Sequence, residues 1–383
     1  MTVEQRLLVD VLACAVAGKP CVLPENMDWR QFVGLCMKHS VAALAYDGLK
    51  KADLWQFAPP PAQKILSGAY NTAIFKDAQF AHLKEKLSCE LKASGVRHIF
   101  LKGASLKKDY PVPELRTMCD LDVLVHTEDY PVIEKIAQTL RGVPGHSDGN
   151  HRNYQFPGEL TVEFHPNLLH HGTPVGTQIN PGWQYANKAG DDLTEEGFYL
   201  NTLCHLANHF VSGGAGVRFI ADVWVNRNLR QPQPDWKKVE AELGRFGLLE
   251  FARNIEDLAE CWFGRGEETE LLQELGEYIL ADGHYGSGEK AVLNAVALSP
   301  NQSRSSALVK KAFYSRAELE DRYPWCKGKP LLLPAAWCAR CFRAVTRHGK
   351  LVIRWSKKTG EISKNEIAEQ KALLGRFGIR PEK

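Results

Sequence analysis

The run Arg116-Thr-Met-Cys-Asp-Leu-Asp-Val-Leu-Val125 constrains this chain more than any other segment. Side chains alternate between the two faces of a β-strand, so Asp120 and Asp122 would share one face and Leu121, Val123 and Val125 the other. Two neighbouring carboxylates repel each other unless a cation neutralises them, and hard oxygen ligands suit Mg²⁺ or Mn²⁺. The run predicts a metal site for phosphoryl chemistry or, if it stands alone, a solvated pair of aspartates at a strand start.

The chain has 383 residues, of which 44% are hydrophobic and 24% charged, an ordinary globular composition with room for two or three domains. No run of 18 apolar residues occurs, so we expect no transmembrane helix. The ten cysteines are scattered along the sequence, which favours a reducing cytoplasm.

Charge argues mildly against a large nucleic-acid surface, because the net charge is only +3. Nucleic acid is therefore a possible binding partner, but it is not the favoured one. One basic cluster lies near the C-terminus, and we interpret it as a solvated helix face. It comprises Arg340, Arg343, Arg347, Lys350, Arg354, Lys357 and Lys358.

One pair of cysteines, Cys338 and Cys341, has the short C-x-x-C spacing. Without a second pair of ligands, this spacing is weak evidence for zinc or for redox chemistry. Whether the pair binds a metal is left open.

Residue patterns divide the chain into three regions, at residues 1–95, 96–192 and 193–383. The first and last are predicted to be helical, and the clearest helix covers residues 62–94, where apolar residues recur every three or four positions. Residues 282–306 are rich in Gly, Ser and Asn, which predicts a loop within the last region.

The middle region carries the strong strand signals. Residues 98–101 form a short apolar run that ends at Lys102-Gly103, and residues 119–125 form the run described above. Residues 153–156 and 160–165 predict a hairpin that turns at Pro157-Gly158. In its second strand Glu163 lies mid-strand, and Thr161 and His165 share its face, so a third carboxylate could complete a two-metal site with Asp120 and Asp122.

Together these motifs resemble the uncharacterised nucleotidyltransferase family within the DNA polymerase β-like nucleotidyltransferase superfamily. The resemblance rests on Leu101-Lys-Gly-Ala-Ser105, Tyr110-Pro111, residues 116–125 and Val162-Glu-Phe-His165. His205, His209 and Arg218-Phe-Ile-Ala-Asp222 resemble the helical part of the same family. The likeness covers roughly residues 30–340 and is sharpest over residues 99–125.

The resemblance implies an α+β fold in which a small mixed-sheet nucleotidyltransferase core is flanked by N-terminal and C-terminal helical regions. It implies that Asp120, Asp122 and Glu163 bind Mg²⁺ or Mn²⁺ and carry the catalysis. It also implies that the triphosphate of a nucleoside triphosphate, with ATP favoured, lies on the metals near the glycine turn.

The expected nucleotide-binding residues are Lys102, Gly103, Ser105 and Arg116. The usual Gly-Ser dipeptide of the superfamily is replaced here by Lys102-Gly-Ala-Ser105, so whether Ser105 reaches phosphate is left open. Gly103 still allows close approach of the backbone to phosphate. Lys102 would add charge there or point to solvent, and Arg116 would bind phosphate or pair with Asp120 or Glu114.

Three histidines and one further aspartate are expected around this site. His165 is expected to hydrogen-bond a carboxylate ligand. His205 and His209 are four residues apart on a helix, which is metal-ligand spacing, but packing or lining of the cleft is favoured because no third ligand is evident. Asp222 could anchor one of these two histidines.

The favoured function is a metal-dependent enzyme that transfers a nucleoside monophosphate to an acceptor hydroxyl and releases pyrophosphate. The acceptor is unknown. The alternatives are a non-catalytic or regulatory nucleotide-binding or interaction protein, or a toxin-like transferase acting on tRNA or protein. The presence of all three carboxylates favours the enzyme.

Overall fold

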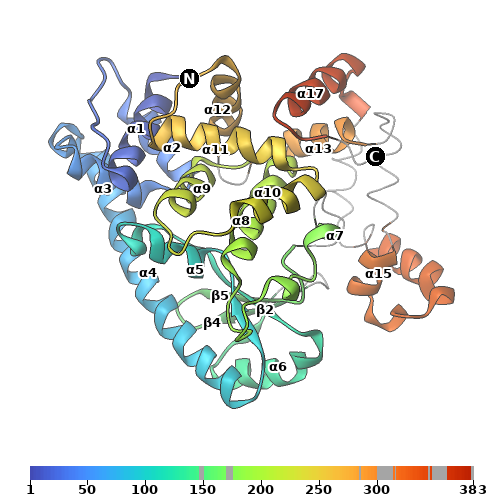
Figure 1. Ribbon diagram of the computed structural model, residues 1–383. Helices are drawn as coiled ribbons and strands as arrows, with labels where there is room; N and C mark the ends of the chain where they lie inside the picture. The colour runs from blue at the N-terminus through green and yellow to red at the C-terminus, as the bar shows by residue number, and fades with distance from the viewer. Residues whose placement is uncertain are drawn as a thin grey trace.

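The computed structural model describes residues 1–145, 151–169, 176–283, 286–299, 314, 316–343, 346 and 360–380. Within these residues one five-stranded mixed sheet is flanked by helices (Figure 1), which confirms the expected α+β class. No helix of the described part is both long enough and apolar enough to cross a membrane.

The sheet has the strand order β1-β2-β5-β4-β3. Its strands are β1 (His98–Phe100), β2 (Asp120–Val125), β3 (Val143–Pro144), β4 (Arg152–Phe156) and β5 (Leu160–His165). The two central strands, β2 and β5, run parallel, and the other neighbours are antiparallel. The predicted hairpin is present as β4 and β5, and its turn contains Gly158 with a φ of 82°.

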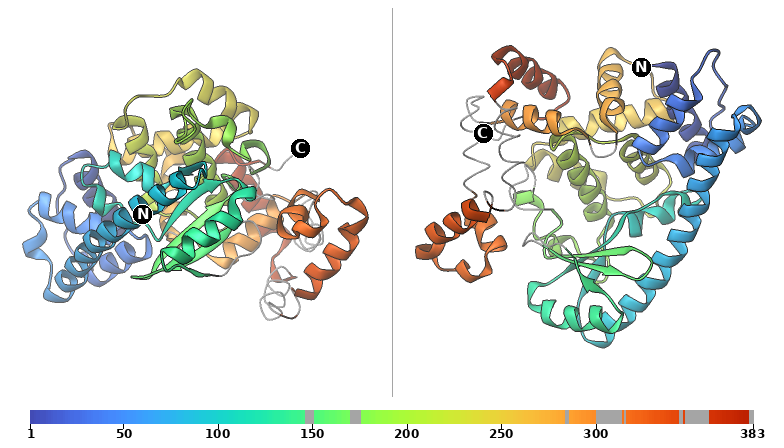
Figure 2. Two further views of the ribbon diagram at one scale, coloured as in Figure 1. Left: turned by 90° about the horizontal axis from the view of Figure 1, so that it is seen from below. Right: turned by 180° about the vertical axis from the view of Figure 1, so that it is seen from behind.

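One face of the sheet is apolar and covered by helices. The odd-numbered residues of β2, from Leu121 to Val125, share a hydrophobic core with Val162 and Phe164 of β5. This core also contains residues of α4 (Pro60–Ala93) and α6 (Tyr130–Thr139). Figures 1 and 2 show the long helix α4 running from the helical part of the molecule along the sheet. Because this face is covered, the other face is available for polar side chains.

The N-terminal and C-terminal helices join in a second, larger core. Helix α1 (Val3–Ala17) packs against α3 (Ala42–Lys51), α9 (Val217–Asn228) and α11 (Leu249–Phe263). The same core includes residues of α2 (Trp29–Lys38) and α8 (Glu195–Val211), together with Ile99 and Leu101 at the edge of the sheet. The polar face of the sheet therefore meets α8 and α9.

The remaining helices are short or lie toward the C-terminus. They are α5 (Gly103–Leu106), α7 (Gly176–Ile179), α10 (Trp236–Arg245), α12 (Glu270–Asp282), α13 (Gly288–Ala297), α15 (Arg316–Arg322) and α17 (Lys364–Arg376). Residues 333–343 are also helical, and they pack with α15 in a small separate cluster beside the main body (Figure 2).

A loop was expected within residues 282–306, and the described residues between α12 and α13, at 283, 286 and 287, are not helical, while α13 occupies the middle of the segment. Ser287 caps this helix by accepting a hydrogen bond from the Lys290 backbone, and Val292 and Val296 are buried. Burial of this apolar stripe is the main source of stability for so short a helix. The basic residues Arg347–Lys358 lie outside the described residues, so their interpretation stays a prediction.

Candidate functional site

The turn after β1 places Lys102 on the polar face of the sheet. Lys102 has a φ of 49° and a ψ of −121°, a backbone region that residues with a side chain rarely adopt. Its ammonium nitrogen Nζ donates to Oδ1 of Asp122 over 2.9 Å. The lysine therefore points into the site rather than to solvent.

Gly103 follows at the start of α5, where the chain passes close to another side chain. A Cβ at this position would lie 2.6 Å from Nη1 of Arg116, closer than real contacts allow. Ser105, two residues later, is buried and donates its hydroxyl hydrogen to the carbonyl oxygen of Phe100 over 2.8 Å. The glycine thus permits close approach, and the serine hydroxyl holds the turn against the strand.

Three carboxylates stand in a row across the two central strands. Asp122 of β2 is the register partner of Glu163 on β5, so both side chains lie on the same face, and Asp120 is two residues back along β2. Asp122 is buried, whereas Asp120 and Glu163 are partly exposed. The structure thus brings together the three carboxylates that the sequence analysis singled out.

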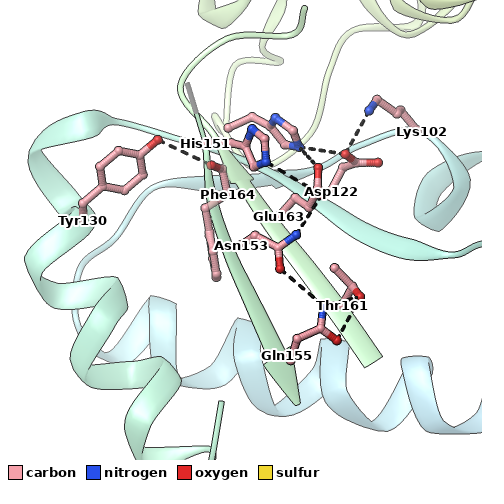
Figure 3. Close-up of polar contacts among 10 residues, drawn as sticks. Lys102, Asp122, Tyr130, His151, Asn153, Gln155, Thr161, Glu163 and Phe164 are labelled. Atoms are coloured by element: carbon pink, nitrogen blue, oxygen red, sulfur yellow. Dashed lines mark hydrogen bonds and ion pairs between the residues drawn. The ribbon is translucent and has the colours of Figure 1, made fainter. Parts of the chain in front are cut away.

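Histidine and amide groups tie this row together (Figure 3). His165 Nε2 lies 2.8 Å from Asp122 Oδ1 and 3.4 Å from Glu163 Oε2. Asn153 of β4 donates from Nδ2 to Glu163 Oε1 over 3.0 Å, and His151 Nε2 lies 3.9 Å from the same oxygen. His165 therefore makes the carboxylate contact that was expected of it.

The electrostatics of the row differ from one carboxylate to the next. Burial and the neighbouring Asp122 charge together raise the pKa of Asp120 to about 6. Burial also acts to raise the pKa of Asp122, but Lys102 and His165 outweigh it and hold that pKa far below its usual range. The hydrogen bond from His165 lowers the pKa of Glu163. Asp122 is thus held as a carboxylate, while Asp120 gives up its proton only near neutral pH.

Two cavities of about 180 and 240 Å³ adjoin the row of carboxylates. The first is lined by Asp120 and Asp122, and the second by Glu163 and His165. Their shared lining residues are Lys102, His205 and His209. The paired aspartates and the third carboxylate therefore face two neighbouring compartments.

The two histidines of α8 contact each other at the border between these compartments. Their Nε2 atoms are 3.2 Å apart. Burial and the nearby Lys102 charge lower the pKa of His205 well below its usual value and that of His209 to about 4. At neutral pH both imidazoles are therefore uncharged and line the cleft, as favoured from the sequence.

Arg116 and Asp222 form a buried ion pair in the wall of the first cavity. Arg116 donates from Nη2 to Asp222 Oδ2 over 2.6 Å and from Nε to Oδ1 over 3.0 Å, and the Tyr110 hydroxyl donates to Oδ1 over 2.7 Å. Burial acts to lower the pKa of Arg116, but Asp222 outweighs it and raises that pKa. Arg116 thus pairs with Asp222 rather than with the expected Asp120 or Glu114. Both oxygens of Asp222 are engaged by this cluster, not by a histidine anchor.

The sequence analysis did not select several polar residues of the site. Arg218 of α9 lines the first cavity and donates to the carbonyl oxygen of Thr117, and its run had been noticed only as part of the resemblance. His151 and Asn153 reach Glu163 from the neighbouring strand or just before it. A period-two count across the hairpin would have found Asn153 and His151, because they share a face two residues apart.

Metal-ligating groups gather at one place among the described residues. His151, Glu163 and His165 each offer one ligand atom, and these atoms lie within 4.8 Å of one another. The carboxylates Asp120 and Asp122 adjoin this group through the contact of Asp122 with His165. Cys338 and Cys341 are both exposed and lie on the helical segment 333–343, and no disulfide joins them.

Comparison with protein-family models matches residues 25–264 to the family described as uncharacterised nucleotidyltransferase. This range contains the sheet, both cavities and every residue of the candidate site. No curated protein and no solved structure matches the chain.

Proposed function

Because the chain belongs to the uncharacterised nucleotidyltransferase family, we propose that it transfers a nucleoside monophosphate from a nucleoside triphosphate to an acceptor hydroxyl. In this reaction the acceptor oxygen bonds to the α-phosphorus, and the bond from that phosphorus to the bridging oxygen of the β-phosphate breaks. Pyrophosphate leaves, and the hydroxyl proton passes to a base in the site.

The observation that carries the proposal is the pairing of Asp122 with Glu163 across parallel strands, with Asp120 beside them. Three neighbouring carboxylates on one face of the sheet repel one another, and the raised pKa of Asp120 is a consequence of burial and of that repulsion. Such a donor set fits a divalent cation with a preference for oxygen ligands. We assign Asp120, Asp122 and Glu163 as the residues that would hold Mg²⁺ or Mn²⁺.

A bound divalent cation would neutralise charge on the triphosphate and favour ionisation of the attacking hydroxyl. The protein supplies the remaining groups. Lys102 carries a positive charge beside Asp122, in the wall of the first cavity, where it would face the triphosphate. Gly103 leaves room for the backbone to approach phosphate.

We assign Ser105 and Arg116 supporting roles, because the structure engages both within the protein. The Ser105 hydroxyl holds the turn that carries Lys102, and Arg116 with Asp222 fixes the wall against which that turn packs. Arg218, in the same wall, adds a second positive charge near the first cavity. These residues would position Lys102 and Gly103 for the nucleotide.

The second cavity is the proposed place of the acceptor. Glu163 lines it and would take the proton of the acceptor hydroxyl, since the lowered pKa keeps this carboxylate ionised. The neutral histidines His205 and His209 separate the two cavities. An acceptor in one and a triphosphate in the other would meet at the carboxylate row, which is the arrangement that in-line transfer requires.

The test is incubation of the purified protein with each α-labelled nucleoside triphosphate, Mg²⁺ or Mn²⁺ and a cell extract. ATP is the favoured donor, and the cytoplasm, which free cysteines support, is the favoured source of the extract. We expect label to appear on one class of molecule and pyrophosphate to be released in equal amount. Nucleotide binding without label transfer would instead support a non-catalytic regulatory protein, and label on tRNA or protein would support the toxin-like alternative.

A further inference from the structure

The Glu163 end of the carboxylate row differs from the rest of the row because two imidazoles face it. His165 is two residues beyond Glu163 on β5, so both side chains share the face of the sheet. Across the hairpin, Asn153 pairs with Glu163 and Arg152 with Phe164. Continuing this register by one residue places His151 opposite His165. The hairpin therefore collects three ligand-type side chains at one point.

We infer that His151, Glu163 and His165 form a binding site for a first-row transition-metal dication such as Zn²⁺. The inference is linked to the proposed function only because Glu163 belongs both to this site and to the carboxylate row. The binding it predicts can be measured in the absence of nucleotide.

The separations among the three groups suit chelation of one ion. Protein ligands bind Zn²⁺ at about 2.0–2.2 Å, so two ligand atoms on a tetrahedral ion lie about 3.4 Å apart. His165 Nε2 and Glu163 Oε2 are 3.4 Å apart, and His151 Nε2 is 3.9 Å from Glu163 Oε1. The imidazole rings of His151 and His165 have their centroids 5.3 Å apart. Small side-chain rotations would close the set around one ion.

The donor atoms select the class of metal. Mg²⁺ prefers oxygen ligands and keeps several waters, whereas imidazole suits zinc, copper, iron and nickel. Two imidazoles and one carboxylate are the ligand set of several catalytic zinc sites, in which a fourth position stays open to water or substrate. The paired aspartates offer oxygen ligands alone and would hold Mg²⁺, so Glu163 would be the carboxylate that the two cation sites share.

Neighbouring side chains orient this cluster as outer ligands do in metal sites. Asn153 Nδ2 donates to Glu163 Oε1 over 3.0 Å, which leaves Oε2 facing His165. Asp122 Oδ1 lies 2.8 Å from His165 Nε2, so the cation would replace this hydrogen bond and lie beside the Asp122 carboxylate. A supporting contact such as that of Asn153 fixes ligand geometry, and its loss commonly weakens metal binding by about 10–100-fold.

The test is titration of the chelator-treated full chain with Zn²⁺ and, separately, with Mg²⁺ by calorimetry, without nucleotide. We expect one Zn²⁺ per chain and at least about ten-fold weaker binding in His151→Gln. The matched control is His82→Gln, because His82 is exposed on α4, and it should bind as the wild type does. Unchanged affinity in His151→Gln, or no Zn²⁺ binding in the wild type, would overturn the inference.

Two further measurements remove the remaining ambiguities. Pulsed electron paramagnetic resonance of the Cu²⁺-loaded wild type should show two coordinated imidazoles, and that of His151→Gln one, which a folding defect would not produce. His209→Gln should bind Zn²⁺ normally, and loss of binding there would place the metal at the α8 histidines instead. Zn²⁺ binding without nucleotidyl transfer would contradict the proposed function but not the zinc site. Mg²⁺-dependent transfer without Zn²⁺ binding would contradict the zinc site but not the proposed function.

Discussion

Lys102 Nζ lies 2.9 Å from Oδ1 of Asp122, the central carboxylate of the row. The lysine reaches it from a backbone with a φ of 49°, which costs on the order of 1–3 kcal/mol for a residue with a side chain. Such strain persists where the surrounding structure imposes it, and it is common at functional sites. Here it delivers a positive charge to a face that carries three carboxylates, so Lys102 is the countercharge built into the site.

Replacing Lys102 by Met should lower kcat/KM for the nucleoside triphosphate by at least about ten-fold, since it removes a charge beside the proposed triphosphate site. It should also raise the pKa of Asp122, because Lys102 is the leading group that lowers it. As the pH is lowered, activity that needs ionised Asp122 would then disappear at a higher pH than in the wild type. A pH profile of kcat/KM measures both effects.

The matched control for this prediction is Lys108→Met, because Lys108 is exposed a few residues later on the same loop. It should leave the rate and the profile unchanged. A Lys102→Met enzyme with wild-type kcat/KM would show that the lysine only balances charge in the resting protein.

The buried pair of Arg116 and Asp222 should contribute mainly to stability. Arg116→Met leaves the Asp222 carboxylate buried without its partner, a change that commonly costs about 3–5 kcal/mol. Arg245→Met is the control, since Arg245 pairs with Glu242 at the surface and should cost no more than about 1 kcal/mol. Urea unfolding measures both. If the Arg116→Met protein were as stable as the wild type and only its KM for the nucleoside triphosphate were raised, Arg116 would be a phosphate-binding residue instead.

Asp120 should make the metal-free protein less stable as pH rises. Its pKa in the folded chain is raised to about 6 by burial and by Asp122, whereas in the unfolded chain it ionises near 3.8. The contribution of Asp120 to the free energy of unfolding therefore falls as the pH rises from about 3.8 to about 6. Above about pH 6 the folded state is destabilised by the full amount.

The variant Asp120→Asn tests this sign. It should raise the free energy of unfolding of the metal-free protein at neutral pH by on the order of 2 kcal/mol, with no gain near pH 4. Saturating Mg²⁺ should cancel the difference, because the cation stabilises the ionised aspartate of the wild type. An equal effect at both pH values would contradict the shifted pKa.

His209 should contribute to acid unfolding in the opposite sense. Burial, Lys102 and Arg218 lower its pKa to about 4, while an unfolded histidine takes up its proton near 6.5. Stability through this group is complete above about pH 6.5 and falls as the pH drops toward 4. His209→Gln should make this fall shallower by on the order of 1–2 kcal/mol, and the exposed control His82→Gln should not. Thermal unfolding across this pH range is the measurement, and equal slopes would refute the neutral histidine pair.

Local patterns in the sequence were sufficient to predict the central strands and the long helix. Alternation of polar and apolar residues from Asp120 to Val123 and around Glu163 predicted the faces of β2 and β5, because one face had to be buried. Helix α4 was predicted within two residues of its ends, since its apolar stripe is long and Gly95 follows it with a φ of 70°.

Contacts between residues far apart in the sequence could not be predicted in the same way. Arg116 and Asp222 meet only because α9 packs over the polar face of the sheet, and no local pattern encodes that packing. His151 precedes the predicted strand at residues 153–156, yet it lies beside His165, with the two ring centroids 5.3 Å apart. The polar composition around α13 likewise concealed a helix whose stability comes from packing.

The central claim is that Asp120, Asp122 and Glu163 form one metal-dependent site for nucleotidyl transfer. The most direct measurement is the rate of pyrophosphate release and label transfer from an α-labelled nucleoside triphosphate in wild type, Asp122→Asn and Glu163→Gln, with and without Mg²⁺. We expect transfer in the wild type only with the cation and a loss of at least about a hundred-fold in both variants, with unfolding midpoints that show both variants are folded. Mg²⁺-dependent transfer at the wild-type rate in Asp122→Asn would contradict the account.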